Sequence, residues 1–280
     1  MASPQTDFPP IRACIFDMDG LLINSEDIIT LSVDQLLLKY GRPSLPKSIR
    51  AKMMGVPKST NGDLFHDWAQ LPIQREQFAR EFKDKMRLNF PNCQPLPGAE
   101  RILSSLSRAC NIFTRQSVEL ALASTTTSET FELKTSNPAT SHLLGFIQPS
   151  RRVLGDDPRV GVGRSKPAPD MYLIALESLN STVDLGAGER PILPEECLVF
   201  EDSVIGVEAG RRAGMRVIWV PHPDLAAEYQ PMEEEVLAGR MEMIEIGDQW
   251  QLGQINDGWA ERIASLEHFD LRKYGFDAPC

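Results

Sequence analysis

Short apolar runs alternate with longer amphipathic stretches along most of this chain. Ala13–Phe16, Leu120–Ala123 and Cys197–Phe200 consist of apolar residues throughout, which is typical of strands buried on both faces of a parallel sheet. Arg152–Leu154 and Arg216–Val220 are further short runs that begin with an arginine. Because helix-length stretches separate these runs, the pattern predicts an α/β fold whose core is a Rossmann-like, doubly wound parallel sheet.

The stretch that follows the first predicted strand contains helical periodicity and no strand pattern. Apolar positions predict helices there over residues 25–40, 47–53, 63–69 and 74–89. We therefore expect residues 24–96 to form an all-helical insertion, and residues 1–23 and 97–280 to form the core domain. Further helices are expected in the core over residues 99–109, 170–179 and 205–213, with a closing helix over 263–274.

The composition is that of a soluble globular protein, and the charge narrows the class of partner. The chain has 280 residues, of which 42% are hydrophobic and 24% charged, and its net charge is −10. An acidic chain lacks the basic footprint of a nucleic-acid-binding protein. No apolar run is long enough to span a membrane, and residues 1–10 lack the apolar centre of a secretory signal. We therefore expect no nucleic-acid or membrane partner.

The five cysteines are scattered along the chain and form no paired motif. Cys14 and Cys197 lie inside predicted strands, where a thiol behaves as a small apolar side chain. An odd number of cysteines without regular spacing fits a reducing compartment. We therefore expect a cytoplasmic protein, with the nucleus as the alternative.

Polar side chains follow the predicted strands at the points where these strands end. Asp17 and Asp19 follow the first strand, Ser124 follows the second, and Glu201 with Asp202 follows the run Cys197–Phe200. The carboxyl ends of parallel strands meet at one edge of a sheet, and ligands bind in the crevice beyond that edge. We therefore expect these side chains to gather at one site.

Carboxylates, a hydroxyl and an ammonium group, the last from Lys166, are the parts that phosphoryl transfer uses. A carboxylate can attack phosphorus and form an aspartyl-phosphate, while Mg²⁺ binds oxygen ligands and bridges the nucleophile and the phosphate. A hydroxyl and a lysine hold the phosphoryl oxygens, and a second carboxyl group gives its proton to the leaving oxygen. Taken alone, the loop around Gly20 fits a surface turn with two solvated acids equally well.

Four motifs in this order resemble those of the haloacid dehalogenase-like (HAD) hydrolase superfamily. The motifs are Phe16–Gly20, Leu122–Ser124, Lys166–Pro167 and Val199–Asp202, and the resemblance covers about residues 12 to 222. It implies that the helical insertion is the cap domain of that family. It also implies a monomeric, Mg²⁺-dependent phosphatase that acts on a small phosphorylated metabolite.

The resemblance implies a role for each motif residue. Asp17 is the expected nucleophile, and Asp19 is the expected general acid for the leaving group and then the base that activates water. Ser124 is expected to bind the phosphoryl group, and Lys166 to pair with Asp17 and the phosphate. The implied Mg²⁺ ligands are Asp17, the main-chain carbonyl of Asp19, and Asp202, with Glu201 beside them.

The second acid of the first motif also separates activities within the superfamily. Relatives that keep a long-lived phosphoenzyme, and dehalogenases, lack an acid at the position of Asp19, so a phosphatase or a phosphomutase is implied. Ile29 stands where sugar phosphomutases with this cap carry a histidine, which favours the phosphatase. A non-catalytic binding protein on this fold is a further alternative, which the presence of Asp17, Asp19 and Lys166 disfavours.

A narrower resemblance concerns the substrate. Residues 134–136, 154–158 and 197–202 look like the pseudouridine 5′-phosphatase branch, which implies a nucleotide-like or sugar phosphate such as pseudouridine 5′-phosphate. Ser165, in place of a glycine, and the long segment 111–117 depart from that branch. Residues 54–58, a loop of the cap, fit an ordinary interhelical turn with a solvated lysine as well as they fit a loop that binds substrate. The expected substrate contacts are Gly20, Thr125 and Thr126 in the core and Gly55 and Lys58 in the cap.

Overall fold

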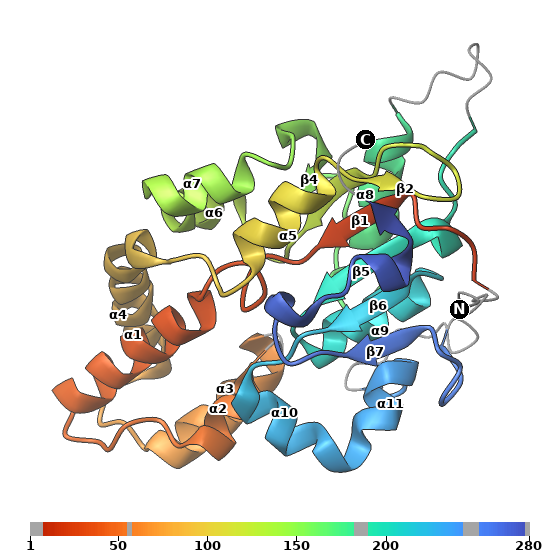
Figure 1. The fold of residues 1–280 in the computed structure, drawn as a ribbon. Helices are drawn as coiled ribbons and strands as arrows, with labels where there is room; N and C mark the ends of the chain where they lie inside the picture. Colours follow the sequence, from red (N-terminus) through yellow and green to blue (C-terminus); the bar gives the residue numbers. More distant parts are fainter. Residues whose placement is uncertain (1–7, 55–57, 182–189, 243–251, 278–280) are drawn as a thin grey trace.

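A six-stranded parallel sheet forms the centre of the computed structural model (Figure 1). The structure describes residues 8–54, 58–181, 190–242 and 252–277, and the side chains of helix α3 from residue 62 onward. The strands are β1 (Ala13–Phe16), β3 (Glu119–Ala123), β4 (Arg152–Val153), β5 (Cys197–Glu201), β6 (Arg216–Trp219) and β7 (Ala260–Arg262). Their order is β4-β3-β1-β5-β6-β7, and each neighbouring pair is parallel, which confirms the predicted fold class.

Strand β1 lies in the middle of the sheet and sets the register of its neighbours. Phe16 is opposite Leu122 of β3 on one side and Phe200 of β5 on the other. All four residues of β1 are fully buried, because helices cover both faces of the sheet at this point. Since the register aligns the carboxyl ends of β1, β3 and β5, whatever follows these strands shares one edge.

Each face of the sheet packs against its own set of helices. Side chains such as Phe16 and Leu122 form one core with α5 (Ala99–Leu106) and α7 (Pro138–Leu144). Ile15 and Val199 face the other way and form a second core with α8 (Asp170–Asn180) and α9 (Val204–Arg212). The remaining core helices are α6 (Ser128–Lys134), α10 (Pro223–Tyr229) and α11 (Glu233–Ala238), with short 3₁₀ turns η1 (Phe90–Asn92), η2 (Pro149–Arg151), η4 (Pro194–Glu196), η5 (Gln230–Met232), η7 (Leu266–His268) and η8 (Arg272–Tyr274).

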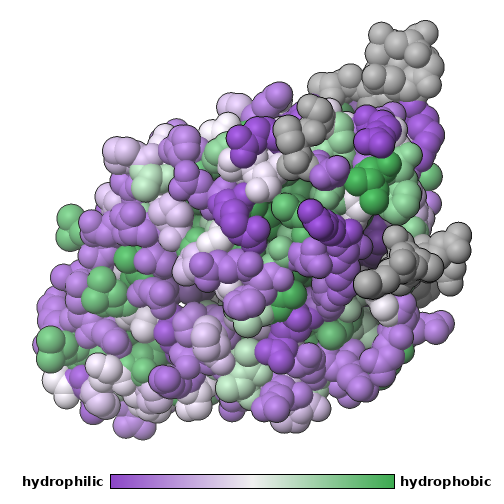
Figure 2. All heavy atoms as spheres, in the orientation of Figure 1, coloured by the Kyte–Doolittle hydropathy of each residue, from purple (hydrophilic) through white to green (hydrophobic). Residues whose placement is uncertain are grey.

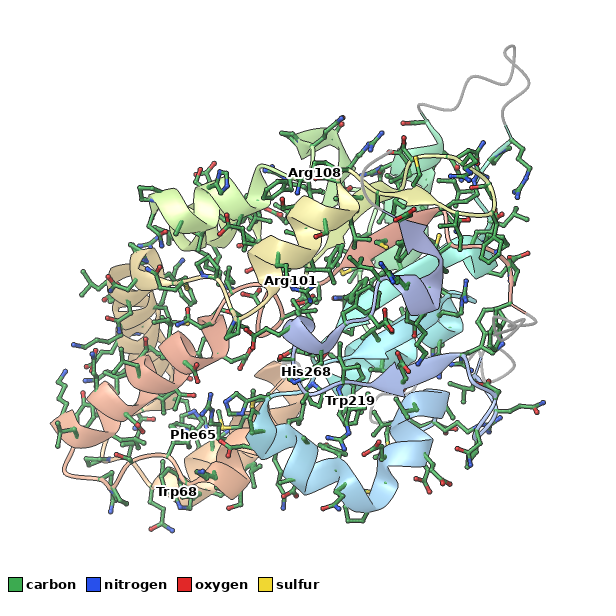
Figure 3. All side chains as sticks on the ribbon, in the orientation of Figure 1. Phe65, Trp68, Arg101, Arg108, Trp219 and His268 are labelled. Carbon is green, nitrogen blue, oxygen red and sulfur yellow. The ribbon has the colours of Figure 1, made fainter. Side chains whose placement is uncertain are left out.

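Four helices between β1 and α5 form a separate unit beyond the carboxyl end of β1 (Figure 1). They are α1 (Ser25–Lys39), α2 (Lys47–Met53), α3 (Lys58–Ala69) and α4 (Arg75–Asn89). The unit has its own small core, in which Leu36 and Leu37 pack near Phe65 and Phe78. Figure 3 shows Phe65 together with Trp68 inside this unit, away from the sheet. The helices α1 to α4 are called the helical unit below.

The chain enters and leaves the helical unit along two segments that lie side by side. The Asn24 amide donates to the Gln94 carbonyl at 3.0 Å, and the Leu96 amide donates to the Leu22 carbonyl at 2.9 Å. Ile23 and Pro95 form an isolated antiparallel bridge between these two bonds. The helical unit therefore joins the core through a short paired ribbon.

The predicted closing helix over residues 263–274 is wrong. The chain there forms two 3₁₀ turns, η7 and η8, after strand β7, which adds to the edge of the sheet beside β6. It ends in β8 (Phe276–Asp277), which pairs antiparallel with β2 (Cys110–Asn111). The apolar residues of this segment are spaced to reach the sheet rather than to form a helix face. Phe269, for example, packs edge-on against Phe200 of β5 at 4.9 Å between ring centres.

Buried thiols occur where the sequence predicts them. Cys14 and Cys197 are fully buried in the sheet and free; Cys93, just after η1, is also buried and free, while Cys110 is disulfide-bonded. Burial raises the pKa of the Cys14 thiol well above its usual value. Within the described ranges, no helix combines the length and the apolar character that a membrane crossing needs. The face seen in Figure 2 is mostly hydrophilic, with hydrophobic residues scattered over it.

Candidate active site

The loop after β1 brings two carboxylates to the edge of the sheet. The Leu22 amide donates to the Met18 carbonyl and the Gly20 amide to the Ile23 carbonyl, each at 3.0 Å, so that the chain curls back on itself. Gly20 adopts a φ of +76°, and a Cβ atom there would collide with a carboxylate oxygen of Asp202. A glycine is therefore required at this position by both backbone and space.

Lys166 connects the first carboxylate to the neighbouring strands. Its Nζ donates to Asp17 Oδ1 at 2.5 Å, to Glu201 Oε1 at 2.7 Å and to the Ala123 carbonyl at 2.8 Å. Burial alone disfavours the ammonium, but the two carboxylates outweigh it and raise the pKa of Lys166 above its usual value. Lys166 is therefore a permanently charged group that fixes Asp17 at the ends of β1, β3 and β5.

The environment of Asp17 disfavours its negative charge more than Lys166 favours it. Burial is the largest influence and raises the pKa of Asp17 to about 7. The charges of Glu201 and Asp19 add to this rise, whereas Lys166 opposes it. A buried carboxylate with this balance is poised to bind a further positive charge.

Glu201 is fully hydrogen-bonded within the protein. Its Oε1 accepts from Lys166 and from the Tyr172 hydroxyl at 2.7 Å, and its Oε2 accepts from the amide and the hydroxyl of Ser203, each at 3.0 Å. Gly206 lies so close that a Cβ atom there would overlap the carboxylate. The motifs predict Glu201 either beside the metal ligands or as a partner of Lys166, and the structure shows the pairing with Lys166.

Asp202 faces the loop around Gly20. Its backbone carbonyl accepts a hydrogen bond of 2.9 Å from Trp219 Nε1, which fixes the turn after β5 (Trp219 is labelled in Figure 3). The side chain is 4% exposed. Burial first, and then the charges of Glu201 and Asp17, raise the pKa of Asp202 well above its usual value. The structure thus brings Asp202 next to Asp17, as the motifs predict.

Ser124 and Asp19 meet on the other side of the site. The Ser124 hydroxyl, which is fully buried, donates to Asp19 Oδ2 at 3.3 Å and accepts from the Thr126 amide at the same distance. Asp19 Oδ1 accepts from Lys134 Nζ at 2.6 Å. Burial acts to raise the pKa of Asp19, but the charge and the hydrogen bond of Lys134, together with the Ser124 hydroxyl, outweigh it, so the pKa is lowered.

Two residues of this site were missed from the sequence. Lys134 lies at the end of α6 and pairs with Asp19, although only its part in the narrower family resemblance marked it beforehand. Glu26 lies in the first turn of α1, where the sequence suggests only a helix start. Burial, and next the charge of Asp19, raise the pKa of Glu26 to about 7. Glu26 is close to the first motif in sequence, but the local pattern does not predict that its side chain faces the site.

The remaining expected substrate contacts have different outcomes. Thr126 is buried, and its hydroxyl accepts from Lys134 at 2.9 Å, so it holds Lys134 in place. Thr125 is exposed at the end of β3. Gly55 and the side chain of Lys58 lie outside the described residues, so their predicted role stays a prediction.

The charge balance of the site fits a divalent cation. The described acids that act on one another here are Asp17, Asp19, Glu26, Glu201 and Asp202, against the two ammonium groups of Lys134 and Lys166. No three His, Cys, Asp or Glu side chains in the described part of the chain form a ready cage for a metal. Mg²⁺ does not need one, because it usually keeps several waters and takes one or two carboxylates. Asp17 and Asp202 can supply these.

Comparison with known proteins places these motifs in a family context. A family model for haloacid dehalogenase-like hydrolases matches residues 14–220. A Saccharomyces cerevisiae protein named probable pseudouridine-5′-phosphatase is 33% identical, over 95% of this chain and 97% of its own length. The Arabidopsis thaliana (DL)-glycerol-3-phosphatase 1, mitochondrial, is 32% identical over 88% of this chain and 76% of its own length.

Solved structures give the same result. The crystal structure of a HAD family hydrolase from Deinococcus radiodurans R1, with bound phosphate and sodium, has a TM-score of 0.59 and 26% identity. The match covers 80% of this chain and 88% of the other. The phosphate in that protein shows that an anion of the expected kind is bound by a related structure.

Proposed function

The chain belongs to the haloacid dehalogenase-like hydrolases and is a phosphatase of that family, and we propose that it hydrolyses a small phosphomonoester through a covalent intermediate on Asp17. One observation carries the proposal. Lys166 binds the Asp17 carboxylate at 2.5 Å, while Ser124 and Asp19 lie together at 3.3 Å on the same edge of the sheet. Nucleophile, phosphoryl-binding groups and proton carrier are thus held in one place.

In the first step, an Asp17 oxygen attacks phosphorus and forms a P–O bond, while the bond from phosphorus to the substrate oxygen breaks. The departing oxygen keeps the electron pair of that bond and takes a proton from the Asp19 carboxyl group. Asp19 is ionised in the free site, as its lowered pKa indicates. A dianionic phosphoryl group beside Ser124 raises the pKa of Asp19, so a proton is taken up when substrate binds.

In the second step, a water oxygen attacks the phosphorus of the aspartyl-phosphate and the bond to Asp17 breaks. The electron pair of that bond returns to the Asp17 carboxylate, and the water proton passes to Asp19. Free phosphate leaves, and Asp19 has regained the proton that it gave in the first step. Ser124 and Lys166 hold the equatorial oxygens throughout, where negative charge is greatest.

Mg²⁺ is the cation that this donor set fits, and the residues that would hold it are Asp17, Asp202 and the main-chain carbonyl of Asp19. When bound, it neutralises charge on the phosphoryl oxygens and lets the carboxylate approach them. Glu201 is not among its ligands in this proposal, since four donors already use both of its oxygens.

The substrate that we propose is a polyol or nucleoside-like monophosphate. The two relatives named above suggest pseudouridine 5′-phosphate and glycerol 3-phosphate as the first compounds to try. We also propose that the protein acts as a cytoplasmic monomer.

The test is phosphate release from a panel of such esters, with and without Mg²⁺, alongside Asp17→Asn. Fast release that depends on the metal and is lost in the variant supports the proposal. Near-normal turnover of Asp17→Asn would overturn the covalent mechanism. An isomeric sugar phosphate without free phosphate would favour a phosphomutase instead, against the evidence of Ile29.

A further inference from the structure

Lys134 occupies an unusual position for a lysine. It is 4% exposed, although it lies at the end of a short surface helix. Its Nζ donates to Asp19 Oδ1 at 2.6 Å and to the Thr126 hydroxyl at 2.9 Å, and it lies over the Phe90 ring at 4.8 Å from the ring centre. Lysine is rarely buried to this extent unless it is paired. The contacts therefore define one orientation of the ammonium group.

These contacts divide the two oxygens of Asp19 between two tasks. Oδ1 is held by Lys134, whereas Oδ2 lies 3.3 Å from the hydroxyl of Ser124. The distance to Ser124 is long for an O–H···O hydrogen bond, so this second oxygen is the less tightly bound of the two. It is also the one on the side where the phosphoryl group is expected. Lys166, not Lys134, contacts the nucleophile.

The same segment of the core also holds the connection to the helical unit. The Asn137 side chain, three residues after Lys134, donates to the Pro91 carbonyl at 3.2 Å, just after Phe90. The Phe90 ring that covers Lys134 belongs to η1, at the return from the helical unit. The lysine is thus held between the Phe90 ring of η1 and the carboxylate of Asp19.

We propose that Lys134 is a positioning residue that holds one oxygen of Asp19, so that the other oxygen faces the leaving group and then the attacking water. This inference rests on the proposed function, because it concerns the proton carrier of that reaction. Without Lys134, the Asp19 carboxylate is free to rotate and has lost its counter-ion. Each proton transfer by Asp19 then becomes slower, while binding of the phosphoryl group is kept by Ser124 and Lys166.

Two substrates, an alkyl and an aryl phosphate, distinguish a role of Lys134 in positioning Asp19 from a role in binding phosphate. The alkyl substrate is glycerol 3-phosphate, whose leaving oxygen needs a proton; the aryl substrate is p-nitrophenyl phosphate, whose leaving phenolate does not. In Lys134→Met we expect a normal burst of phenolate, because Asp17 is phosphorylated without help from Asp19. Steady-state turnover should fall about 10²-fold for both substrates, since hydrolysis of the intermediate needs the base, and KM should change less than about threefold.

Three further variants make the test decisive. Lys134→Arg keeps the charge and should recover activity to within about tenfold of the wild type. In an Asp19→Asn background, Lys134→Met should cost less than about twofold more, because a residue that acts only through Asp19 has nothing left to hold. Lys83→Met, at an exposed lysine of α4, is the matched control and should behave as the wild type. The double variant also covers the case in which Lys134→Met alone does not fold.

Four results would contradict the inference. They are an unchanged turnover in folded Lys134→Met, a loss of the phenolate burst, a large rise in KM without a fall in kcat, and a large further loss in the Asp19→Asn background. A wild type that releases no phosphate and forms no phosphoenzyme is a different result, because it would overturn the proposed function itself.

Discussion

The edge of the sheet and the boundary between α2 and α10 are both built from charged residues, but they hold their charges differently. At the sheet edge, Lys166 is 3% exposed and its three hydrogen bonds are 2.5 to 2.8 Å long. At the boundary, Asp224 of α10 faces Arg50 at 3.4 Å and Lys47 at 3.5 Å, and the Lys47 side chain is 86% exposed. Figure 1 shows α2 beside α10 below the sheet.

From this difference we expect the sheet edge to be a fixed part and the helical unit to be a part that moves against it. Buried pairs with several short bonds are costly to break, because each partner is then left unpaired. A pair with an exposed partner at a longer distance, such as Lys47 with Asp224, contributes less and is screened by salt. The Arg50 and Asp224 side chains are only 14% and 11% exposed, so that pair differs from the sheet edge in its longer distance and not in exposure. The sheet edge is therefore suited to hold reacting groups, and the boundary is suited to let the helical unit open and close over them.

The largest effect is expected from Asp17→Asn, which removes the nucleophile from the fixed part. Turnover should fall by at least about 10³-fold, while the fold is kept, because the amide can still accept from Lys166. Phosphate release and a thermal melt on the same sample measure the two properties. A variant that is inactive only because it is unfolded would not support the role of Asp17.

A second change loosens the fixed part without touching the nucleophile. In Glu201→Gln the side-chain amide must face either Lys166 or the donors of Ser203, so a buried hydrogen bond is lost whichever way it turns. We expect a loss of about 3 kcal/mol in the free energy of unfolding, together with reduced activity. Tyr172→Phe, which removes only one bond to Glu201, should cost about 1 kcal/mol. Denaturant titration compares the two, and equal losses would mean that the charge of Glu201 is unimportant.

The raised pKa values of two acids in the site predict how the free energy of unfolding depends on pH and on Mg²⁺. Asp17 and Glu26 have pKa values raised to about 7 in the fold, from ordinary values of 3.8 and 4.5. Between about pH 4 and 7 the folded protein therefore binds more protons than the unfolded chain, so the metal-free protein loses stability as the pH rises. Above pH 7 both acids are charged. Each then bears the full cost of burying a charge, together with repulsion from the neighbouring carboxylates.

Mg²⁺ should relieve that repulsion most where it is strongest. The rise in Tm on adding Mg²⁺ should accordingly be larger at about pH 8 than at about pH 5, and smaller in Asp202→Asn at both. Melting curves with and without the metal give the comparison. A rise of the same size at both pH values would show that these carboxylates do not take part in binding the cation.

The smallest effect is expected at the boundary. Asp224→Asn removes the acid that Lys47 and Arg50 of the helical unit share. Both pairs are 3.4 to 3.5 Å long and Lys47 is exposed, so the substitution should cost about 1 kcal/mol in the free energy of unfolding, less than Glu201→Gln. KM should rise about two- to threefold, and high salt should produce a similar change in the wild type. Steady-state kinetics at low and high salt test this. A loss of activity as large as that of Glu201→Gln would place Asp224 in the fixed part.

The sequence predicts the fixed part well, because apolar runs and the residues after them are local features. The bounds of β1 are found as predicted, and Asp17, Ser124 and Asp202 lie at the edge where their strand ends indicate. Lys166 reaches the same edge from the loop before α8. The role of Glu201 is decided by Tyr172 and Ser203, which reach it from α8 and the start of α9. Tyr172 reaches Glu201 only through the packing of α8 and leaves no local signal, whereas Ser203 is two positions away in sequence.

Other features were out of reach for related reasons. Lys134 reaches Asp19 across 115 positions of sequence, and its burial depends on the ring of Phe90 from a third segment. The C-terminal segment 263–274 is predicted to be a helix, but its residues form two 3₁₀ turns whose apolar side chains pack on the core. Their partners are the sheet and the antiparallel strand pair, which no pattern within the segment records.

The paired ribbon at Asn24 and Gln94 has a consequence for how such a chain can be assembled. For the sheet, the whole stretch between these two residues is equivalent to a tight turn, because its ends are joined by two hydrogen bonds. The Asn24 amide donates to the Gln94 carbonyl at 3.0 Å, and the Gln94 amide donates to Asn24 Oδ1 at 2.7 Å. A segment attached in this way can be lengthened, exchanged or cut out without changing the strand order around it. The helical unit is thus a piece of the chain that can be exchanged while the residues at the sheet edge stay in place, apart from Glu26, which belongs to both.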